Sequence, residues 1–269
     1  MNTLLILRLL IDNYKTQNTN KSKMNIAIIP ARYASTRFPG KPLVEIEGKT
    51  MIQRVVEQAL QVKNLDKVVV ATDDERIFLH VKKMGCEVMM TSENHQSGTD
   101  RCAEVAQKLK LKKDDIVINI QGDEPFIQPS QIADLLAFMQ KKDTILIGTL
   151  AKKITDISFL ENPNIVKVIF DADQKAIYFS RSAIPFLRGE KKENWLSKAD
   201  FYKHVGMYAY RFSALEKITK LAPSRLELLE SLEQLRWLEN GFSIGINLTD
   251  LETIGIDTPE DLARIVGRL

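Results

Sequence analysis

Residues 25–43 read NIAIIPARYASTRFPGKPL and decide the fold, because a short apolar strand runs directly into a loop rich in proline and cations. Open parallel sheets bind ligands beyond the carboxyl ends of their strands. Arg32, Arg37 and Lys41 all lie in this loop. Guanidinium groups bind pairs of phosphate oxygens and an ammonium supplies a compact charge, so the loop predicts a polyphosphate site. The alternative is a basic surface loop.

The loop matches neither of two common phosphate-binding patterns. It lacks the GxGxxG fingerprint of dinucleotide-binding domains and the GxxxxGK[ST] pattern of P-loop ATPases. The sequence therefore disfavours a dinucleotide-dependent dehydrogenase and a P-loop ATPase.

Apolar runs and helical periodicity alternate on the carboxyl side of this loop. We expect strands at 25–30, 67–72, 86–90 and 116–121, and helices at 51–60, 75–84, 99–109 and 130–140. Such alternation predicts an α/β fold with a mostly parallel sheet that is covered on both faces.

The rhythm changes after Leu150. Residues 165–171 and 175–180 flank the turn-forming stretch 171–174 and predict a hairpin. We also expect a strand at 204–211, a helix at 226–240 and a closing helix that begins after Thr258. The sequence thus predicts one α/β domain over 24–269 with an inserted antiparallel lobe at about 151–225.

Residues 1–23 form a separate N-terminal segment. Their apolar run is too short to span a membrane, so we expect no stable membrane insertion. We interpret the segment as a dispensable extension, with a short amphipathic docking helix as the alternative. This segment carries much of the formal net charge of +3, so charge gives no argument for a nucleic-acid partner.

The two cysteines, Cys86 and Cys102, lack the spacing of metal ligands and cannot make a disulfide framework. Both fall in apolar patterns, so we predict that they are buried free thiols. A reducing compartment, the cytoplasm, fits this usage.

A second polar turn, Gln121-Gly122-Asp123-Glu124-Pro125, ends the fourth expected strand. If the strand order reverses between the first and fourth strands, this turn faces the cationic loop across the switch point. A carboxylate at Asp123 could then hold Mg²⁺, which proteins bind through one or two carboxylates plus phosphate oxygens. The alternative is an aspartate with a purely structural place in a turn.

The loop resembles the signature of CMP-Kdo synthetases, also called 3-deoxy-manno-octulosonate (Kdo) cytidylyltransferases. The resemblance covers essentially all of 24–269, and further matches follow in order: ATD (71–73), HQSGTDR (95–101), QGDEP (121–125), NPN (162–164), YFSR (178–181), LEQLR (232–236) and DTPEDL (257–262). It implies a Rossmann-like nucleotidyltransferase fold of the glycosyltransferase-A type, dependence on Mg²⁺ and a homodimer.

The resemblance also implies an activity, in which CMP passes from CTP to the anomeric hydroxyl of Kdo for lipopolysaccharide synthesis. The expected catalytic residues are Arg32, Lys41 and Asp123. The expected nucleotide contacts are Pro30, Ala31, Arg32, Arg37, Lys41, Thr72, Ser97, Gly98 and Gln121. Asp257 is the expected second metal carboxylate beside Asp123, although alone it could simply support the last helix.

A sugar acid needs a guanidinium fork for its carboxylate and neutral groups for its hydroxyls. Arg181 and Gln234 are the expected sugar contacts, with His204 behind them or in a purely structural place. The spacing of Glu227, Glu230 and Glu233 does not decide whether they face the sugar or solvent.

Two alternatives to this function stay open at the level of sequence. One is a cytidylyltransferase for a related acid sugar, 8-amino-Kdo or sialic acid. The other is a catalytically inactive nucleotide-binding module.

Overall fold

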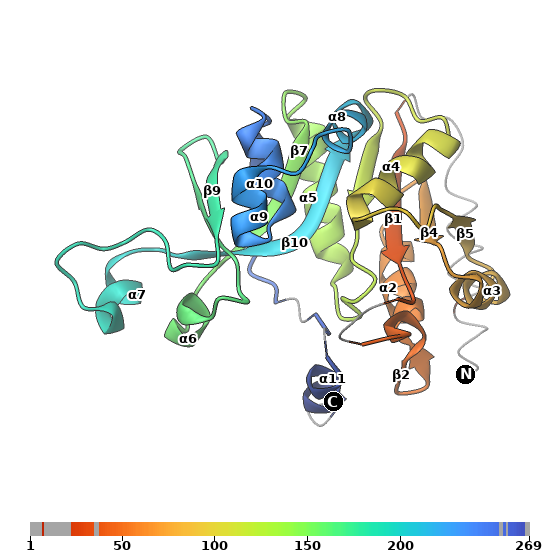
Figure 1. The fold of residues 1–269 in the computed structure, drawn as a ribbon, viewed down its shortest axis with the longest axis horizontal. Coiled ribbons are helices and arrows are strands. Elements are labelled where there is room, and N and C mark those ends of the chain that lie inside the picture. The colour runs from red at the N-terminus through yellow and green to blue at the C-terminus, as the bar shows by residue number, and fades with distance from the viewer. Residues whose placement is uncertain (1–6, 8–22, 35–37, 253–254, 257, 267–269) are drawn as a thin grey trace.

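The computed structural model describes residues 7, 23–34, 38–252, 255–256 and 258–266, and within them one mixed sheet of nine strands. The main path of the sheet runs β11-β7-β10-β6-β1-β4-β5. Figure 1 labels β7, β10, β1, β4 and β5 of this path. The strands are β1 (Asn25–Ala31), β4 (Lys67–Thr72), β5 (Glu87–Met90), β6 (Ile116–Asn119), β7 (Ile147–Lys153), β10 (Tyr202–Arg211) and β11 (Ile244–Leu248).

Strand β1 shows why both faces of the sheet are covered. Ala27 and Ile29 belong to one core and Ile26 and Ile28 to another, and all four are fully buried. Helices α2 (Met51–Leu60), α3 (Glu75–Lys83) and α5 (Pro129–Lys141) pack on the first face. Helices α4 (Gly98–Lys108), α8 (Phe212–Ile218) and α10 (Glu233–Glu239) pack on the second. A strand buried on both faces is mostly apolar, and every residue of β1 after Asn25 is apolar.

The strand order reverses beside β1, as expected. Strand β1 pairs in parallel with β4 on one side and with β6 on the other. The chain builds β4 and β5 outward before it returns to β6, so the carboxyl ends of β1 and β6 flank the switch point. This is where a doubly wound sheet binds its ligand.

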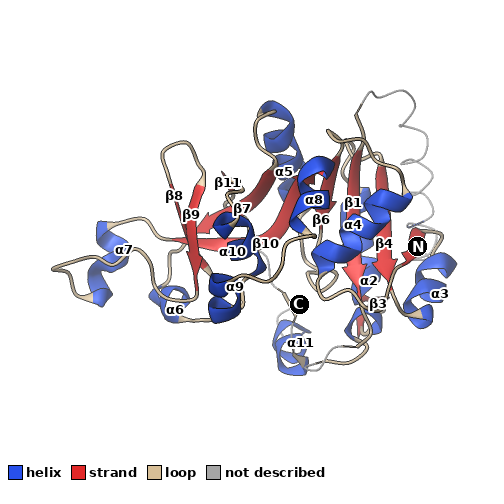
Figure 2. Ribbon diagram, turned by 45° about the horizontal axis from the view of Figure 1, so that its top comes forward, coloured by secondary structure: helices blue, strands red, loops and turns tan. Residues whose placement is uncertain are grey.

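The inserted lobe lies at one end of the sheet (Figure 2). Its hairpin, β8 (Lys167–Phe170) and β9 (Ala176–Ser180), is antiparallel and confirms the predicted turn. Two helices, α6 (Ile157–Glu161) and α7 (Trp195–Lys198), enclose a small core with Trp195 and Phe201. Strand β10 then returns to the main sheet antiparallel to β6 and β7.

The predicted single helix at 226–240 is wrong, because the structure has two short helices there. Helix α9 (Arg225–Glu230) ends at Ser231, which has φ 52° in the left-handed region, and α10 starts at Glu233. At this break the Arg181 guanidinium donates to the carbonyls of Glu230 and Ser231. Tertiary contacts thus bind the carbonyls that a continuous helix would have used internally.

The remaining elements are the 3₁₀ turns η1 (Lys41–Leu43) and η2 (Lys192–Asn194), the hairpin β2 (Glu45–Ile46) with β3 (Lys49–Thr50), and α11 (Pro259–Val266). Of the N-terminal segment before Lys23 only Leu7 is described, and its side chain is buried against Met84. No helix in the described part of the chain has the length and apolarity to cross a membrane. Cys102 is buried, whereas Cys86 is only partly buried.

Candidate active site

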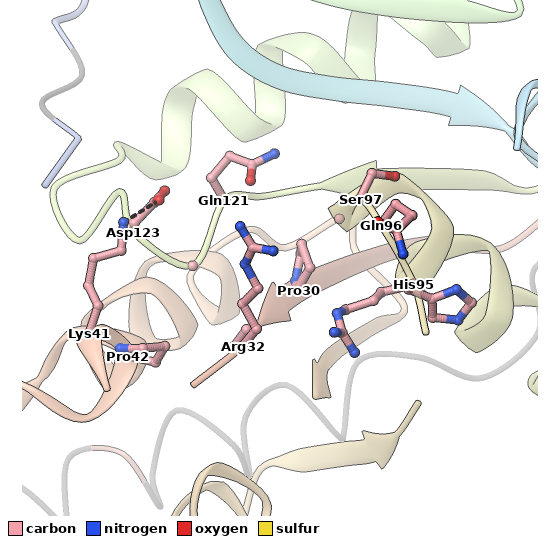
Figure 3. Close-up of a pocket in the computed structure, with 13 residues that line it drawn as sticks. Pro30, Arg32, Lys41, Pro42, His95, Gln96, Ser97, Gln121 and Asp123 are labelled. Atoms are coloured by element: carbon pink, nitrogen blue, oxygen red, sulfur yellow. Dashed lines mark hydrogen bonds and ion pairs between the residues drawn. The ribbon is translucent and has the colours of Figure 1, made fainter. Parts of the chain in front are cut away.

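A cavity of about 250 Å³ opens at the carboxyl ends of β1 and β6 (Figure 3). The chain brings three loops together here: the end of β1 with η1, the loop before α4, and the turn after β6. Its lining residues are Pro30, Ala31, Arg32, Lys41, Pro42, His95, Gln96, Ser97, Gly98, Arg101, Gln121, Gly122 and Asp123.

One end of the cavity holds a charged pair. Gly40, with φ 72°, turns the chain into η1 and so places Lys41 beneath the turn after β6. The Lys41 ammonium then donates to Asp123 Oδ2 at 2.7 Å, and Lys41 is only 9 % exposed. Arg32 extends into the cavity between this pair and Pro30 (Figure 3). Two cations and one carboxylate in this part of the lining leave a local excess of positive charge, which suits an anionic ligand.

The cavity wall depends on a close approach of two backbones. A Cβ atom added to Gly122 would lie 2.8 Å from the carbonyl oxygen of Pro30. A Cβ atom on Gly98 would lie 3.0 Å from Pro30 Cγ. Glycine at both positions therefore lets the turn after β6 and the start of α4 close around Pro30.

The opposite end of the cavity is polar and mostly neutral. Ser97 caps α4: its Oγ accepts from the Asp100 N–H, and the Asp100 carboxylate accepts from the Ser97 N–H, both at 3.1 Å. Such a capping box fixes the first turn of the helix. Gln121 and Gln96 add amide groups that both donate and accept. A nucleobase needs neutral partners of this kind.

Arg101 also lines the cavity and is 3 % exposed. Its guanidinium donates to Thr91 Oγ1 at 2.8 Å and to the Ser92 carbonyl at 3.1 Å, and it forms an ion pair with Asp73. The ion pair with Asp73 neutralises the charge of Arg101. Arg101 therefore stabilises the loop through its hydrogen bonds and does not offer an unpaired positive charge to a ligand.

The structure places eight of the predicted nucleotide-binding and catalytic residues in the cavity lining: Pro30, Ala31, Arg32, Lys41, Ser97, Gly98, Gln121 and Asp123. Thr72 is fully buried at the end of β4, where its Oγ1 accepts from the Asp74 N–H at 3.2 Å, and it does not line the cavity. Arg37 and Asp257 lie outside the described residues. The roles assigned to all these residues stay predictions.

The sequence assigned no role to His95, Gln96, Pro42 and Arg101, although all four line the cavity. His95, Gln96 and Arg101 belong to the HQSGTDR stretch that supported the family resemblance. The motif therefore contained these three residues, but only the fold of the loop before α4 shows that they line the cavity.

The three predicted sugar-binding residues lie outside the cavity lining, toward the lobe. The Arg181 guanidinium donates to the carbonyls of Glu230, Pro163 and Ser231. Gln234 is buried on α10. Helix α10 contacts the first turn of α4, whose Gly98 lines the cavity, because Thr99 Oγ1 donates to Glu233 Oε2 at 2.7 Å.

His204 lies on β10 with its ring edge-on to Phe179. Its Nε2 lies 2.9 Å from Thr149 Oγ1, whose proton is directed to the Met207 carbonyl at 2.7 Å. The hydroxyl therefore accepts from Nε2–H, which leaves Nδ1 as the acceptor nitrogen. Burial lowers the pKa of His204 to about 3, so the imidazole is neutral at ordinary pH.

The three glutamates of α9 and α10 have different partners. Glu227 forms an ion pair with Arg236, and Glu230 accepts from Ser180 Oγ at 2.7 Å. Burial raises the pKa of Glu233, which faces α4.

The described residues contain no group of three side chains able to hold a metal ion on their own. Mg²⁺ does not need such a group, since it keeps several waters and binds one or two carboxylates together with substrate phosphates. The Asp123 carboxylate, beside the cations of the cavity, fits one such ligand.

Comparison with known proteins identifies relatives over most of the chain. A family profile described as "Cytidylyltransferase" matches residues 26–250. A 3-deoxy-manno-octulosonate cytidylyltransferase of Cytophaga hutchinsonii is 56 % identical over 241 residues, or 89 % of this chain and 95 % of the relative. That of Parabacteroides distasonis is 54 % identical over 248 residues, or 91 % and 97 % of the two chains.

The chain is also similar to solved structures. The structure of a CMP:2-keto-3-deoxy-manno-octonic acid synthetase complexed with CTP superposes with a TM-score of 0.84 at 42 % identity, covering 91 % of this chain and 98 % of that one. A 4-diphosphocytidyl-2C-methyl-D-erythritol synthase, at 13 % identity and a TM-score of 0.60, shares the fold alone.

Proposed function

Because this chain belongs to the cytidylyltransferase family, among relatives named 3-deoxy-manno-octulosonate cytidylyltransferases, we propose that it transfers CMP from CTP to Kdo. The products are CMP-Kdo and pyrophosphate, and the activated sugar serves lipopolysaccharide synthesis. One observation carries the proposal: the Lys41–Asp123 pair and Arg32 line one cavity at the switch point, together with a neutral polar wall.

The cavity orients CTP by its two ends. The triphosphate takes the cationic end, because the positive charge of Arg32 and Lys41 exceeds the one described carboxylate there. The cytidine takes the neutral end, where Gln121 and the residues at the start of α4 offer hydrogen bonds. The α-phosphate then lies between the two ends, open to a sugar that approaches from the lobe.

The reaction is an in-line displacement at the α-phosphorus. The anomeric hydroxyl oxygen of the sugar forms the new P–O bond, the bond to the β-phosphate oxygen breaks, and the hydroxyl proton is released to solvent. Arg32 and Lys41 hold the phosphate oxygens on which negative charge builds up. Positioning and electrostatic stabilisation carry most of the acceleration in such transfers.

Mg²⁺ belongs to this proposal. Asp123 and Asp257 would hold the ion, and the fit of Asp123 rests on its place beside the phosphate-binding cations. When bound, the ion would polarise the α-phosphate and neutralise charge on the triphosphate. Arg37 would help to order the phosphate loop.

We also propose a homodimer in the cytoplasm, where CTP is available. The lobe is the candidate interface, because Phe186 is 76 % exposed and Ile177 is 58 % exposed on it. Burial of such side chains against a second copy would be favourable. Light scattering that gives a monomer mass at micromolar concentration would contradict the dimer.

The test offers CTP and Mg²⁺ with Kdo, 8-amino-Kdo or sialic acid and measures pyrophosphate release. We expect release with Kdo and at most slow release with the other two sugars. Release only with another acid sugar would keep the transfer chemistry and overturn the substrate. CTP binding without release for any sugar would point to a nucleotide-binding module.

A further inference from the structure

Glu104 lies on α4 outside the cavity lining, yet its carboxylate contacts the loop that forms one cavity wall. Its Oε2 accepts from the Ser92 N–H at 2.9 Å and lies 2.5 Å from His95 Nε2. Its Oε1 lies 2.6 Å from the Lys108 ammonium one turn along the helix. Burial alone would raise the pKa of Glu104, but hydrogen bonds from Lys108, Ser92 and His95 outweigh it and lower the pKa to about 2.

Arg101 contacts the same loop from the preceding turn of α4. Residues 101, 104 and 108 repeat at the spacing that places side chains on one face of a helix. Arg101 donates to Thr91 Oγ1 and to the Ser92 carbonyl, and Glu104 accepts from the Ser92 N–H. Both backbone polar groups of Ser92 are therefore bonded to α4, so the loop has little freedom to move relative to the helix.

The same loop supplies cavity residues at its far end. His95, Gln96 and Ser97 line the cavity, and Ser97 caps α4 itself. The segment from Ser92 to Ser97 is thus fixed at the Ser92 end by Glu104 and at the Ser97 end by the helix cap. His95, between these two points, is held by Glu104 as well.

We propose that Glu104 is a positioning residue that holds the loop at 91–97 in the shape that binds the cytidine end of CTP. This inference rests on the proposed function, which places the base at the neutral end of the cavity. Glu104 touches no substrate; it acts through His95 and the backbone of Ser92. Hydrogen bonds to an ionised carboxylate are stronger than bonds between neutral groups, which suits a group that must keep a surface loop in one conformation.

The test compares Glu104→Ala and Glu104→Gln with a matched control, Lys108→Gln. Lys108 pairs with Glu104 and donates to the Met90 carbonyl, but no hydrogen bond joins it to Ser92 or His95. We would measure the Kd for CTP with Mg²⁺ by calorimetry, kcat/KM for CTP and for UTP, and the melting temperature of each variant. The CTP-to-UTP ratio is the decisive readout, because a general loss of stability does not change which base is preferred.

For Glu104→Ala we expect the Kd for CTP to rise about tenfold and the preference for CTP over UTP to fall at least about threefold. Glu104→Gln keeps the side-chain shape without the charge and should give a smaller change of the same kind. Lys108→Gln should leave both quantities within about twofold of wild type. If Glu104→Ala folds poorly, the Gln variant carries the comparison.

A lower melting temperature with an unchanged Kd and an unchanged CTP-to-UTP ratio in both Glu104 variants would overturn the proposal. Measurements on the wild type distinguish a failure of the proposed function from a failure of this inference. A wild-type protein that binds no CTP would overturn the proposed function together with this inference. A wild-type protein that binds CTP, beside variants that bind it equally well, would overturn this inference alone.

Discussion

Lys41 Nζ lies 2.7 Å from Asp123 Oδ2, which joins the phosphate loop after β1 to the turn after β6. The two residues are 82 positions apart in the sequence. The pair is partly buried, so each charge is stabilised by the other and by whatever the cavity binds. Removal of either partner breaks this ion pair at one end of the cavity.

Lys41→Met should lower kcat/KM on the order of 10²–10³-fold, the usual cost of one preorganised contact to a charged transition state. The matched control is Lys67→Met at the amino end of β4, away from the carboxyl ends where the cavity opens. This change removes the pair with Glu87 and should leave activity unchanged. Steady-state pyrophosphate release measures both. Near-normal activity of Lys41→Met would place the triphosphate elsewhere.

Asp123→Asn should lower turnover by about 10²-fold or more and raise the Mg²⁺ concentration needed for half-maximal rate. Asparagine keeps the shape and can still accept from Lys41, but it lacks the charge that a hard cation prefers. A magnesium titration at saturating CTP measures the effect. Near-normal turnover with unchanged Mg²⁺ dependence would rule out a metal role for Asp123.

Gly122→Ala should weaken CTP binding by about tenfold or more. The added Cβ would lie 2.8 Å from the Pro30 carbonyl oxygen, a backbone atom that can move only if β1 and β6 separate at their ends. Gly206→Ala is the control, since its Cβ would lie 3.9 Å from the nearest atom. Equal affinity of the two variants for CTP would show that the close approach at Pro30 is not needed for binding.

We expect the buried His204 to make the protein less stable as the pH is lowered. Its pKa of about 3 in the folded protein lies below the usual value of 6.5, so the unfolded chain binds a proton that the folded chain does not. Stability is therefore lost as the pH falls below about 6.5. Between pH 7 and pH 5 this one residue should cost about 2 kcal/mol of unfolding free energy.

Urea denaturation of the wild type and His204→Gln at both pH values measures this contribution. We expect the wild type to lose about 2 kcal/mol more than the variant over this interval, while other titrating groups cancel in the difference. Parallel losses in the two proteins would mean that His204 is protonated as easily in the folded state as in the unfolded state.

Gln234→Ala should raise the KM for Kdo about tenfold and leave the KM for CTP unchanged, if Gln234 binds the sugar as predicted. The control is Gln61→Ala, an exposed glutamine at the end of α2. Steady-state kinetics with each substrate varied in turn separate the two constants. A rise in the KM for CTP alone would move Gln234 to the nucleotide side of the site.

The sequence predicted the strands with a continuous apolar run, such as 26–31 in β1 and 68–71 in β4, because burial on both faces requires that composition. Strands β7 and β11 were missed. Each contains a glycine, and Gly148 pairs with Gly245 in register. A Cβ on Gly148 would lie 2.8 Å from Met139 Sδ, and one on Gly245 would lie 2.8 Å from Ile145 Cδ1. The packing of α5 and of Ile145 against this pair explains the glycines.

The site was predictable where residue type alone carries the chemistry, as in the cations of the phosphate loop and the carboxylate at Asp123. It was not predictable where a side chain contacts a segment that only folding brings next to it. The break at Ser231 depends on Arg181, and the hold of Glu104 on Ser92 depends on how the loop bends back over α4. Neither contact has a local signal in the sequence.

A phosphorus NMR spectrum of CTP, Kdo and Mg²⁺ incubated with the protein tests the proposed CMP transfer most directly. We expect the triphosphate signals to disappear while pyrophosphate and a phosphodiester signal of CMP joined to the sugar appear in equal amounts. Lys41→Met should leave the CTP signals in place over the same time. CTP that stays intact with the wild type, or that yields CMP without a sugar phosphodiester, would contradict the account.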